Sequence, residues 1–249
     1  MFFNQDNQTT HLNDADLSKL IKITSHLIHH VSMPEPGLYS TLSKDDIWLG
    51  LVLEFCVLNG RRLTDELKTD TIKFYEFREK INYRFLLSLK NNRKEYLAHV
   101  LKTYKATSFY NKQAERLEEV FNSPKVVKGN QLVLLQGIDH RLQHFNEIRD
   151  TLISRIPHFK LKSASDFMIE NGLSLDVMAI NSRIADVLNQ HFGLEVSSHK
   201  IHSNKTVYES IESCLRKACD NIGIPLAYLS RMLDTYTEKD TISYLLEDN

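Results

Sequence analysis

Residues 156–167 read Ile156-Pro157-His158-Phe159-Lys160-Leu161-Lys162-Ser163-Ala164-Ser165-Asp166-Phe167, and this stretch decides the fold. Ile156-Pro157 is suited to end a helix, because proline lacks an amide hydrogen and restricts the residue before it. The next residues, His158-Phe159-Lys160, then form a tight hairpin, and a second helix follows from Lys162 to Asn171. The N–H groups of such a hairpin can bind phosphate oxygens. The stretch therefore predicts two helices joined by a hairpin over about residues 148–172.

The rest of the chain favours helices. Its 249 residues include only 8 glycines and 5 prolines, which indicates few turns, and no alternating strand pattern stands out. Asn13 or Asp14 is suited to cap a first helix over residues 14–31, and Gly172, Gly193 and Gly223 stand where helices should end. The other helices are expected at 45–58, within 70–121 with breaks near 91–92 and 107–108, and at about 139–155, 162–171, 182–192, 206–221, 225–236 and 239–247.

Charge and composition limit the class of protein. The formal net charge is −1, so binding to nucleic acid cannot rest on bulk charge and any phosphate-binding surface must be local. No apolar run approaches the roughly 20 residues that span a bilayer, and the N-terminus does not resemble a signal peptide. The three cysteines, Cys56, Cys214 and Cys219, form no CxxC pair. We therefore expect a cytoplasmic protein with reduced thiols, no membrane segment and no metal site.

Three segments match one family pattern in order and approximate spacing. They are 156–167, Phe109-Tyr110-Asn111-Lys112-Gln113-Ala114-Glu115-Arg116, and Asn221-Ile222-Gly223-Ile224-Pro225-Leu226. Together with the apolar helix at 47–58, they resemble the archaeal-type 8-oxoguanine DNA glycosylases, a branch of the helix–hairpin–helix DNA glycosylase superfamily. The resemblance implies an all-α fold with two helical subdomains and a DNA-binding cleft between them. It also implies a glycosylase-like domain at 44–240, preceded by a helical extension at 1–43 and followed by a tail at 241–249.

The resemblance implies a chemistry for Lys162, which falls where the family keeps its nucleophilic lysine. A neutral lysine amine can attack C1′ of a flipped nucleotide and release the base, and the resulting Schiff base also permits strand cleavage. Spacing alone favours an ordinary solvated lysine, and it is the resemblance that changes this interpretation. No metal or organic cofactor is needed, and the implied partner is double-stranded DNA that carries a modified base and is bound by a monomer.

Asn181 falls where the family keeps a catalytic aspartate, and this departure has three explanations. An asparagine keeps the hydrogen-bond geometry but cannot accept a proton or supply negative charge. It is an engineered trap, or a natural change with the role moved to Asp166, Glu170 or Asp176, or the mark of a protein that binds DNA without catalysis. The sequence leaves these three open.

Other departures concern DNA contacts and the base pocket. The family hairpin carries glycines where this chain has His158 and Lys160, whose side chains, with Arg183, are candidates to contact phosphate. Arg61 follows a helix end that in the superfamily approaches the gap left by the extruded base. The family's last helix places an aspartate and a tryptophan against 8-oxoguanine, and the aligned residues here are Ser230 and Asp234.

The proposed activity is therefore excision of a modified base by a lysine-dependent DNA glycosylase, with or without strand cleavage. The altered pocket argues against 8-oxoguanine as the preferred base and suits a larger or more polar one. Repair of oxidised guanine and removal of hypermodified bases from foreign DNA as a defence are both candidate roles. The alternatives are a catalytically impaired DNA-binding protein of this fold and an all-α interaction domain without enzymatic activity.

Overall fold

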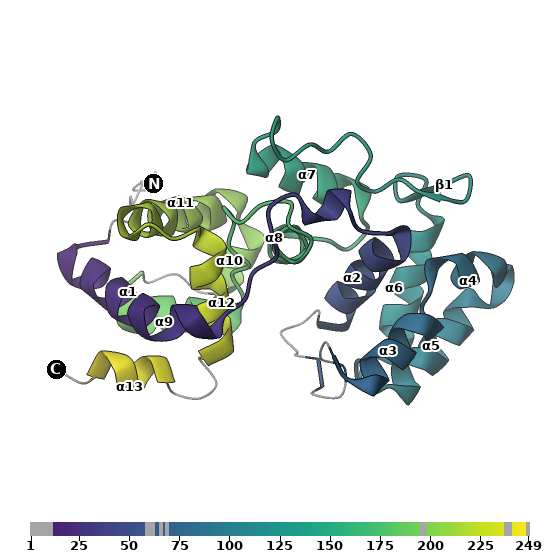
Figure 1. The fold of residues 1–249 in the computed structure, drawn as a ribbon, viewed down its shortest axis with the longest axis horizontal. Helices are drawn as coiled ribbons and strands as arrows, with labels where there is room; N and C mark the ends of the chain where they lie inside the picture. Colours follow the sequence, from purple (N-terminus) through teal and green to yellow (C-terminus); the bar gives the residue numbers. More distant parts are fainter. Residues whose placement is uncertain are drawn as a thin grey trace, which may run out of the picture. The chain divides into compact units, whose positions relative to one another are not determined.

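The computed structural model describes residues 12–57, 63–64, 67, 70–194, 198–236 and 241–247. Nearly all the regular structure in these ranges is helical (Figure 1). The chain divides into two compact units, which are called here the middle unit, Pro34–Ser174, and the terminal unit, Met1–Met33 with Leu175–Asn249. The expectation of an all-α protein is confirmed. The boundaries expected after residues 43 and 240 stay predictions.

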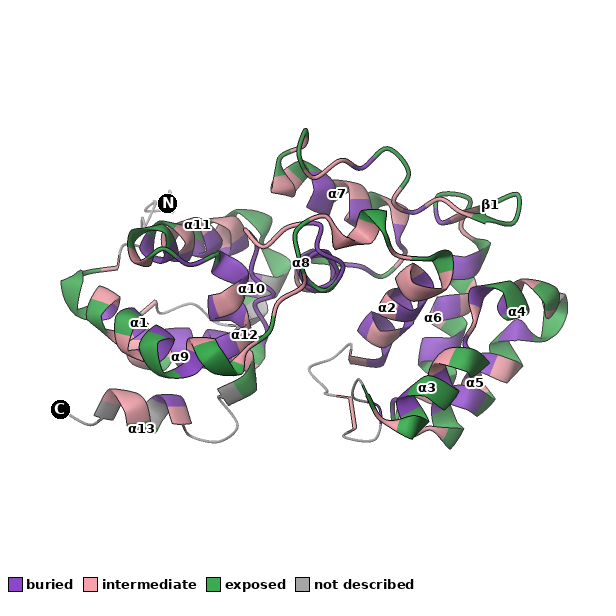
Figure 2. Ribbon diagram, in the orientation of Figure 1, coloured by how far each residue is buried: buried purple, intermediate pink, exposed green. Residues whose placement is uncertain are grey.

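The middle unit contains the predicted hairpin. Its elements are η2 (Leu38–Ser40), α2 (Lys44–Val57), α3 (Ile72–Lys80), α4 (Tyr83–Ser88), η4 (Lys90–Asn92), α5 (Arg93–Thr103), α6 (Tyr110–Asn122), β1 (Val127–Lys128), β2 (Gln131–Leu132), α7 (Phe145–Arg155) and α8 (Leu161–Glu170). Strands β1 and β2 form a two-residue antiparallel ladder, the only sheet among the described residues. Trp48 is fully buried, and its ring centroid lies 5.1 Å from that of Phe121. Helix α8 is buried along most of its length (Figure 2).

The terminal unit joins the two ends of the chain. Its elements are α1 (Asp14–Leu27), η1 (Ile28–His30), α9 (Ser182–Phe192), α10 (Ser198–Ser203), α11 (Lys205–Ile222), α12 (Leu226–Tyr236) and α13 (Thr241–Glu247). Helix α1 packs against α11, α12 and α13, so the N-terminal helix is part of the same core as the C-terminal ones. Asn13 caps α1 as predicted, because its side chain accepts a hydrogen bond from the Asp16 N–H at 3.0 Å.

Two predicted helices are shorter than expected. The helix expected over 14–31 ends at Leu27, where the short η1 follows. The helix expected over about 139–155 begins only at Phe145, because side chains in the preceding segment bond to the backbone and compete with helical hydrogen bonds. The Asp139 N–H donates to Gln143 Oε1 at 2.9 Å, and the Arg141 N–H donates to Asp139 Oδ1 at 2.9 Å. His144 then caps α7 by accepting from the Asn146 N–H at 3.3 Å.

Gly172 ends α8 in a way that only glycine permits. Its φ of +64° is left-handed, and a Cβ atom at this position would lie 2.3 Å from the backbone oxygen of Glu35. The Gly37 N–H also donates to the Gly172 carbonyl at 2.7 Å. This close approach anchors the segment before α2 to the end of α8. Gly193 and Gly223 are left-handed as well, so all three predicted helix ends are confirmed.

Among the described residues, no helix is both long and apolar enough to cross a membrane.

Candidate active site

The hairpin between α7 and α8 has the predicted position. Helix α7 ends at Arg155, Ile156 takes an extended conformation, and α8 begins at Leu161. The turn closes when the Phe159 N–H donates to the Ile156 carbonyl at 3.2 Å. Phe159 is buried, and its ring packs against Phe55 of α2 and Phe167 of α8 at centroid distances of 5.8 and 5.9 Å. Packing of the Phe159 ring therefore holds the hairpin against α2 and α8.

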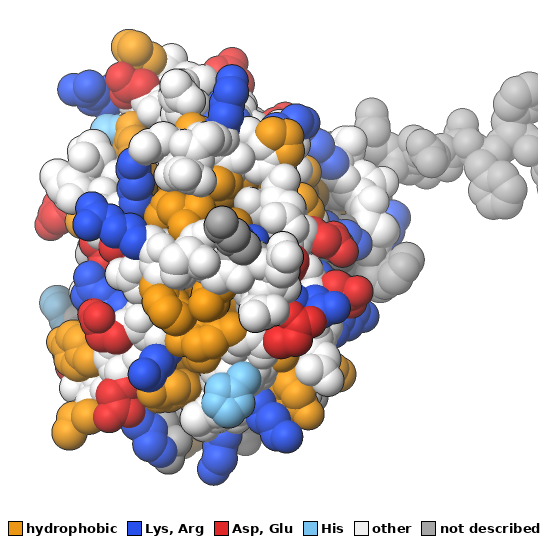
Figure 3. Space-filling view, turned by 90° about the vertical axis from the view of Figure 1, so that its right-hand side faces the viewer, with side chains coloured by type: hydrophobic (Ala, Val, Ile, Leu, Met, Phe, Trp, Pro, Cys, Tyr) orange, Lys and Arg blue, Asp and Glu red, His pale blue; other side chains and the backbone are white. Residues whose placement is uncertain are grey.

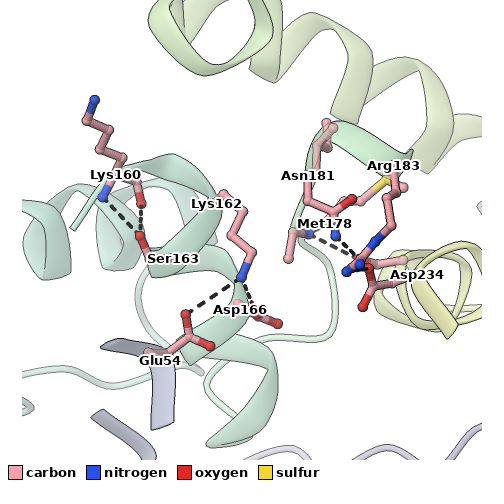
Figure 4. Close-up of polar contacts among 12 residues, drawn as sticks. Glu54, Lys160, Lys162, Ser163, Asp166, Met178, Asn181, Arg183 and Asp234 are labelled. Carbon is pink, nitrogen blue, oxygen red and sulfur yellow. Dashed lines mark hydrogen bonds and ion pairs between the residues drawn. The ribbon is translucent and has the colours of Figure 1, made fainter. Parts of the chain in front are cut away.

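His158 has a left-handed backbone conformation. Its φ is +69°, a conformation that costs a residue with a Cβ atom about 1–2 kcal/mol. Its Nε2 atom lies 2.6 Å from Oε2 of Glu119 on α6, so the imidazole has an acidic neighbour within the protein. Lys160 directly precedes α8, where its N–H donates to Ser163 Oγ at 3.3 Å, and its exposed side chain extends away from Ser163 (Figure 4). The phosphate contacts expected of His158 and Lys160 stay predictions.

Lys162 lies between two carboxylates in the middle unit. Its Nζ atom is 2.7 Å from Oδ2 of Asp166, one turn further along α8, and 3.9 Å from Oε2 of Glu54 on α2 (Figure 4). The exposed fraction of the Lys162 side chain is 21%, against 12% for Asp166 and 6% for Glu54. The Lys162 amine therefore has one carboxylate neighbour on its own helix and a second, more distant one on α2, and a carboxylate can take up a proton.

Sequence reasoning missed Glu54, although a signal was present. Between Ile47 and Val57 it is the one charged residue in an otherwise apolar helix. An isolated carboxylate inside an apolar run is buried only when it has a partner. The packing of α2 against α8 brings Glu54 to Lys162, more than a hundred positions along the chain, and no local pattern encodes that pairing.

Asn181 caps α9 in the terminal unit and uses both ends of its amide. Its Oδ1 atom accepts from the Ile184 N–H at 2.9 Å, and its Nδ2 group donates to Asp234 Oδ1 at 2.5 Å. The same Asp234 oxygen accepts from Arg183 Nη2 at 3.0 Å (Figure 4). Asn181 is 8% exposed, while the Arg183 and Asp234 side chains are about one quarter exposed.

The segment that leads into Asn181 is held by buried side chains. Three consecutive backbone N–H groups donate to them: Met178 to Glu212 Oε1 at 2.9 Å, Ala179 to Ser230 Oγ at 3.1 Å, and Ile180 to the Tyr208 hydroxyl at 3.1 Å. Sequence reasoning missed Glu212 and Tyr208. Both lie on the buried face of α11. Glu212 could have been noticed, because it is an acidic residue at a position where the helical period places apolar side chains.

The predicted site residues thus fall into two groups. Asn181, Arg183 and Asp234 are in contact in the terminal unit, where the Ser230 hydroxyl is bonded to the Ala179 N–H. The middle unit holds Lys162, His158 and Lys160. Arg61 lies outside the described residues, so its role stays a prediction.

The three carboxylates considered as replacements for an aspartate at 181 differ in their surroundings. Asp166 contacts Lys162, Asp176 Oδ1 accepts from Arg216 Nε at 3.0 Å, and Glu170 is exposed. Asp166 is therefore in direct contact with the candidate nucleophile.

Charged side chains of both signs are mixed on the face shown in Figure 3. Lysine and arginine side chains lie beside acidic and apolar ones there, and no part of that face is uniformly basic. The pattern fits the net charge of −1.

Comparison with known proteins identifies the architecture. No family model matches the chain, and no curated protein matches its sequence. Among solved structures, the crystal structure of the 8-oxoguanine DNA glycosylase of Methanocaldococcus jannaschii is similar, with a TM-score of 0.61. The superposition covers 90% of this chain and 94% of that one, at 20% sequence identity. This chain has a helix–hairpin–helix DNA glycosylase fold. The fold class implied by the three sequence segments is therefore confirmed.

Proposed function

We propose that this protein is a DNA glycosylase that excises a modified base from double-stranded DNA, with Lys162 as the nucleophile. The observation that carries the proposal is the half-buried amine of Lys162 at the start of α8, 2.7 Å from Asp166. Two largely buried carboxylates, one of them on another helix, hold the Lys162 amine at this position. The glycosylase fold supports the general class of activity.

The reaction needs a neutral amine, and Asp166 is placed to accept the ammonium proton. The nitrogen lone pair then forms a bond to C1′, while the glycosidic bond breaks and its electron pair leaves on the base, which takes up a proton. Loss of a proton from nitrogen and opening of the C1′–O4′ bond, with protonation of O4′, gives a Schiff base. Water hydrolyses it to an abasic site. Loss of a C2′ proton with expulsion of the 3′ phosphate instead cleaves the strand.

The base that fits is expected to differ from 8-oxoguanine. The family's tryptophan is replaced by Asp234, which removes an aromatic face for stacking, and Ser230 stands where the family has an aspartate. A larger or more polar modified base is the proposed substrate class, with repair and defence against foreign DNA as the two candidate roles. The competing function is DNA binding without catalysis, which the neutral side chain of Asn181 favours.

Borohydride trapping tests the nucleophile without knowledge of the base. A duplex with one abasic site should give a covalent adduct with the wild-type protein, because reduction of the imine fixes the Lys162–C1′ bond. Duplexes with 8-oxoguanine and with a panel of larger modified bases then identify the substrate. Lys162→Ala should give no adduct, whereas Lys94→Ala, at an exposed lysine of α5, should trap like wild type. Equal trapping by Lys162→Ala, or no adduct with any duplex, would show that the proposal is wrong.

A further inference from the structure

We propose that three exposed lysines of the middle unit, Lys44, Lys125 and Lys128, form a contact surface for the DNA phosphate backbone beside the hairpin. They are called here the ribbon lysines. This inference rests on the proposed function, because it takes duplex DNA as the partner. It assigns to these lysines a role in binding that is separate from the reaction. All three belong to the middle unit, so the surface depends on that unit alone.

Lys125 is fixed at the end of the helix that leads into the hairpin. Its Nζ atom donates to the Ser154 carbonyl at 2.9 Å, in the last turn of α7, and Ser154 is four residues before His158. The last carbonyls of a helix carry partial negative charge, which favours a cation at this place. An ammonium group has three N–H donors, and the bond to Ser154 uses one of them. The charge of Lys125 is therefore held next to the hairpin, with donors that can face a phosphate.

Lys128 lies at the end of the two-stranded ribbon. Strands β1 and β2 are joined by Gly129 and Asn130, whose φ angles of +53° and +63° are both left-handed, the pattern of a two-residue type I′ turn. Lys128, Gly129 and Asn130 are exposed, and a Cβ atom on Gly129 would meet nothing within 4 Å. The ribbon projects from the body of the middle unit (Figure 1). This tight turn therefore presents Lys128 to a partner on a well-defined backbone.

Lys44 joins the ribbon from the start of α2. Its Nζ atom contacts Oε1 of Gln131, and Gln131 is the residue that pairs with Lys128 across the ribbon. Directly opposite residues share one face of a strand pair, so Lys128 and the side chain that Lys44 contacts lie on the same face. Lys125 and Lys128 are three residues apart, which places their Cα atoms at most about 10 Å from each other. The three positive charges are thus gathered in one part of the middle unit.

The acidic residues nearest to the ribbon lysines in sequence bind partners within the protein. Asp45 accepts from the Tyr83 N–H at 2.8 Å. Asp46 Oδ1 lies 2.5 Å from Arg78 Nη2, and Glu119 contacts the hairpin imidazole. The net charge of −1 gives the whole molecule no general attraction for DNA, so binding needs local cations such as the ribbon lysines.

Contacts of this kind have a measurable signature. Phosphate contacts position a protein on DNA without reading its sequence. Each cation that neutralises a phosphate releases counterions, so every contact adds about 0.9 to the slope with which log affinity falls against log salt concentration. Loss of one ribbon lysine should therefore lower this slope by about 0.9 and weaken binding about 10-fold at about 0.1 M salt. The trapping rate at saturating protein should stay the same, because the ribbon lysines act in binding and not on the reacting atoms.

Binding to a duplex with a reduced abasic site, which cannot form an imine, tests the surface. Fluorescence anisotropy between about 50 and 200 mM salt gives the affinity of wild type, Lys44→Gln, Lys125→Gln, Lys128→Gln and the triple variant. Glutamine removes the charge and keeps a donor for the contacts within the protein. Each single variant should lose about 0.9 from the slope and the triple variant about 3. Lys125→Arg keeps the charge and should bind like wild type. Lys94→Gln, at an exposed lysine of α5, is the matched control and should keep the wild-type slope.

The possible results separate this inference from the proposed function. A wild-type salt slope in the triple variant, with a borohydride adduct from wild type, would overturn the inference and leave the glycosylase proposal standing. An equal loss of slope in Lys94→Gln would also overturn it, because the effect would then not belong to the ribbon. Weak binding by Lys125→Arg would show that charge is not the cause. No adduct from wild type with any duplex would instead contradict the glycosylase proposal, while the salt slopes still decide whether the ribbon lysines bind DNA.

Discussion

Oδ2 of Asp166 lies 2.7 Å from Nζ of Lys162, one helical turn away on α8. This i, i+4 pair differs from a surface ion pair, because both side chains are largely buried and Glu54 of α2 lies on the other side of the amine. In its charged form the amine cannot attack, so its proton needs an acceptor at short range. Asp166 meets that need without any rearrangement of the hairpin.

The first prediction concerns that proton acceptor. Asp166→Asn should lower the single-turnover trapping rate on an abasic-site duplex by about 100-fold, because the amide can bond the amine but cannot accept its proton. Glu54→Gln should have a smaller effect, since Glu54 Oε2 lies 3.9 Å from Nζ and makes a weaker contact. Circular dichroism serves as the check that both variants are folded. A wild-type rate in folded Asp166→Asn would assign the proton transfer to another group.

The second prediction concerns the end of α8. Gly172→Ala should lower the free energy of unfolding by about 3 kcal/mol or more, since its Cβ atom would meet the Glu35 backbone oxygen and its backbone is left-handed. Gly223→Ala is the matched control, because Gly223 is also left-handed but a Cβ atom there meets nothing within 4 Å. It should cost about 1 kcal/mol. Urea unfolding measures both, and equal losses would refute the steric explanation.

The sequence could predict much of the fold, because the signals for helices are local. Asn13 as a cap, the glycines after α8, α9 and α11, and the hairpin at 156–160 all occur where the pattern placed them. The predicted start of α7 was wrong. Side-chain hydrogen bonds around Asp139 compete with helix formation, and the apolar periodicity does not reveal them.

The candidate site was less predictable, because its contacts join distant parts of the chain. Lys162 was singled out by the family resemblance, and its role as nucleophile stays a prediction. Its partner Glu54 depends on the packing of α2 on α8. Similarly, the family resemblance pointed to Asp234 as a base contact, which stays a prediction, and it gave no sign of the bond from the Asn181 amide to Asp234. Such pairings depend on tertiary structure, and the local spacing of residues carries no information about them.

The third prediction concerns pH and the buried thiol of Cys56 on α2. Burial, assisted by the negative charge of Glu54, raises the pKa of Cys56 from 9.0 to about 12. In the unfolded chain the thiol ionises near pH 9, so its contribution to stability is complete below pH 9 and is lost as the pH rises toward 12. Wild type should therefore be more stable than Cys56→Ala at pH 8, and the difference should shrink by up to about 1.4 kcal/mol per pH unit above pH 9. Val52→Ala shortens a buried side chain of the same helix that does not titrate. Its loss in free energy of unfolding relative to wild type should therefore be the same at both pH values. Urea unfolding at pH 8 and pH 10 measures the free energy of unfolding of wild type and both variants. If the difference from wild type changes with pH equally in Cys56→Ala and Val52→Ala, Cys56 ionisation does not limit stability at high pH.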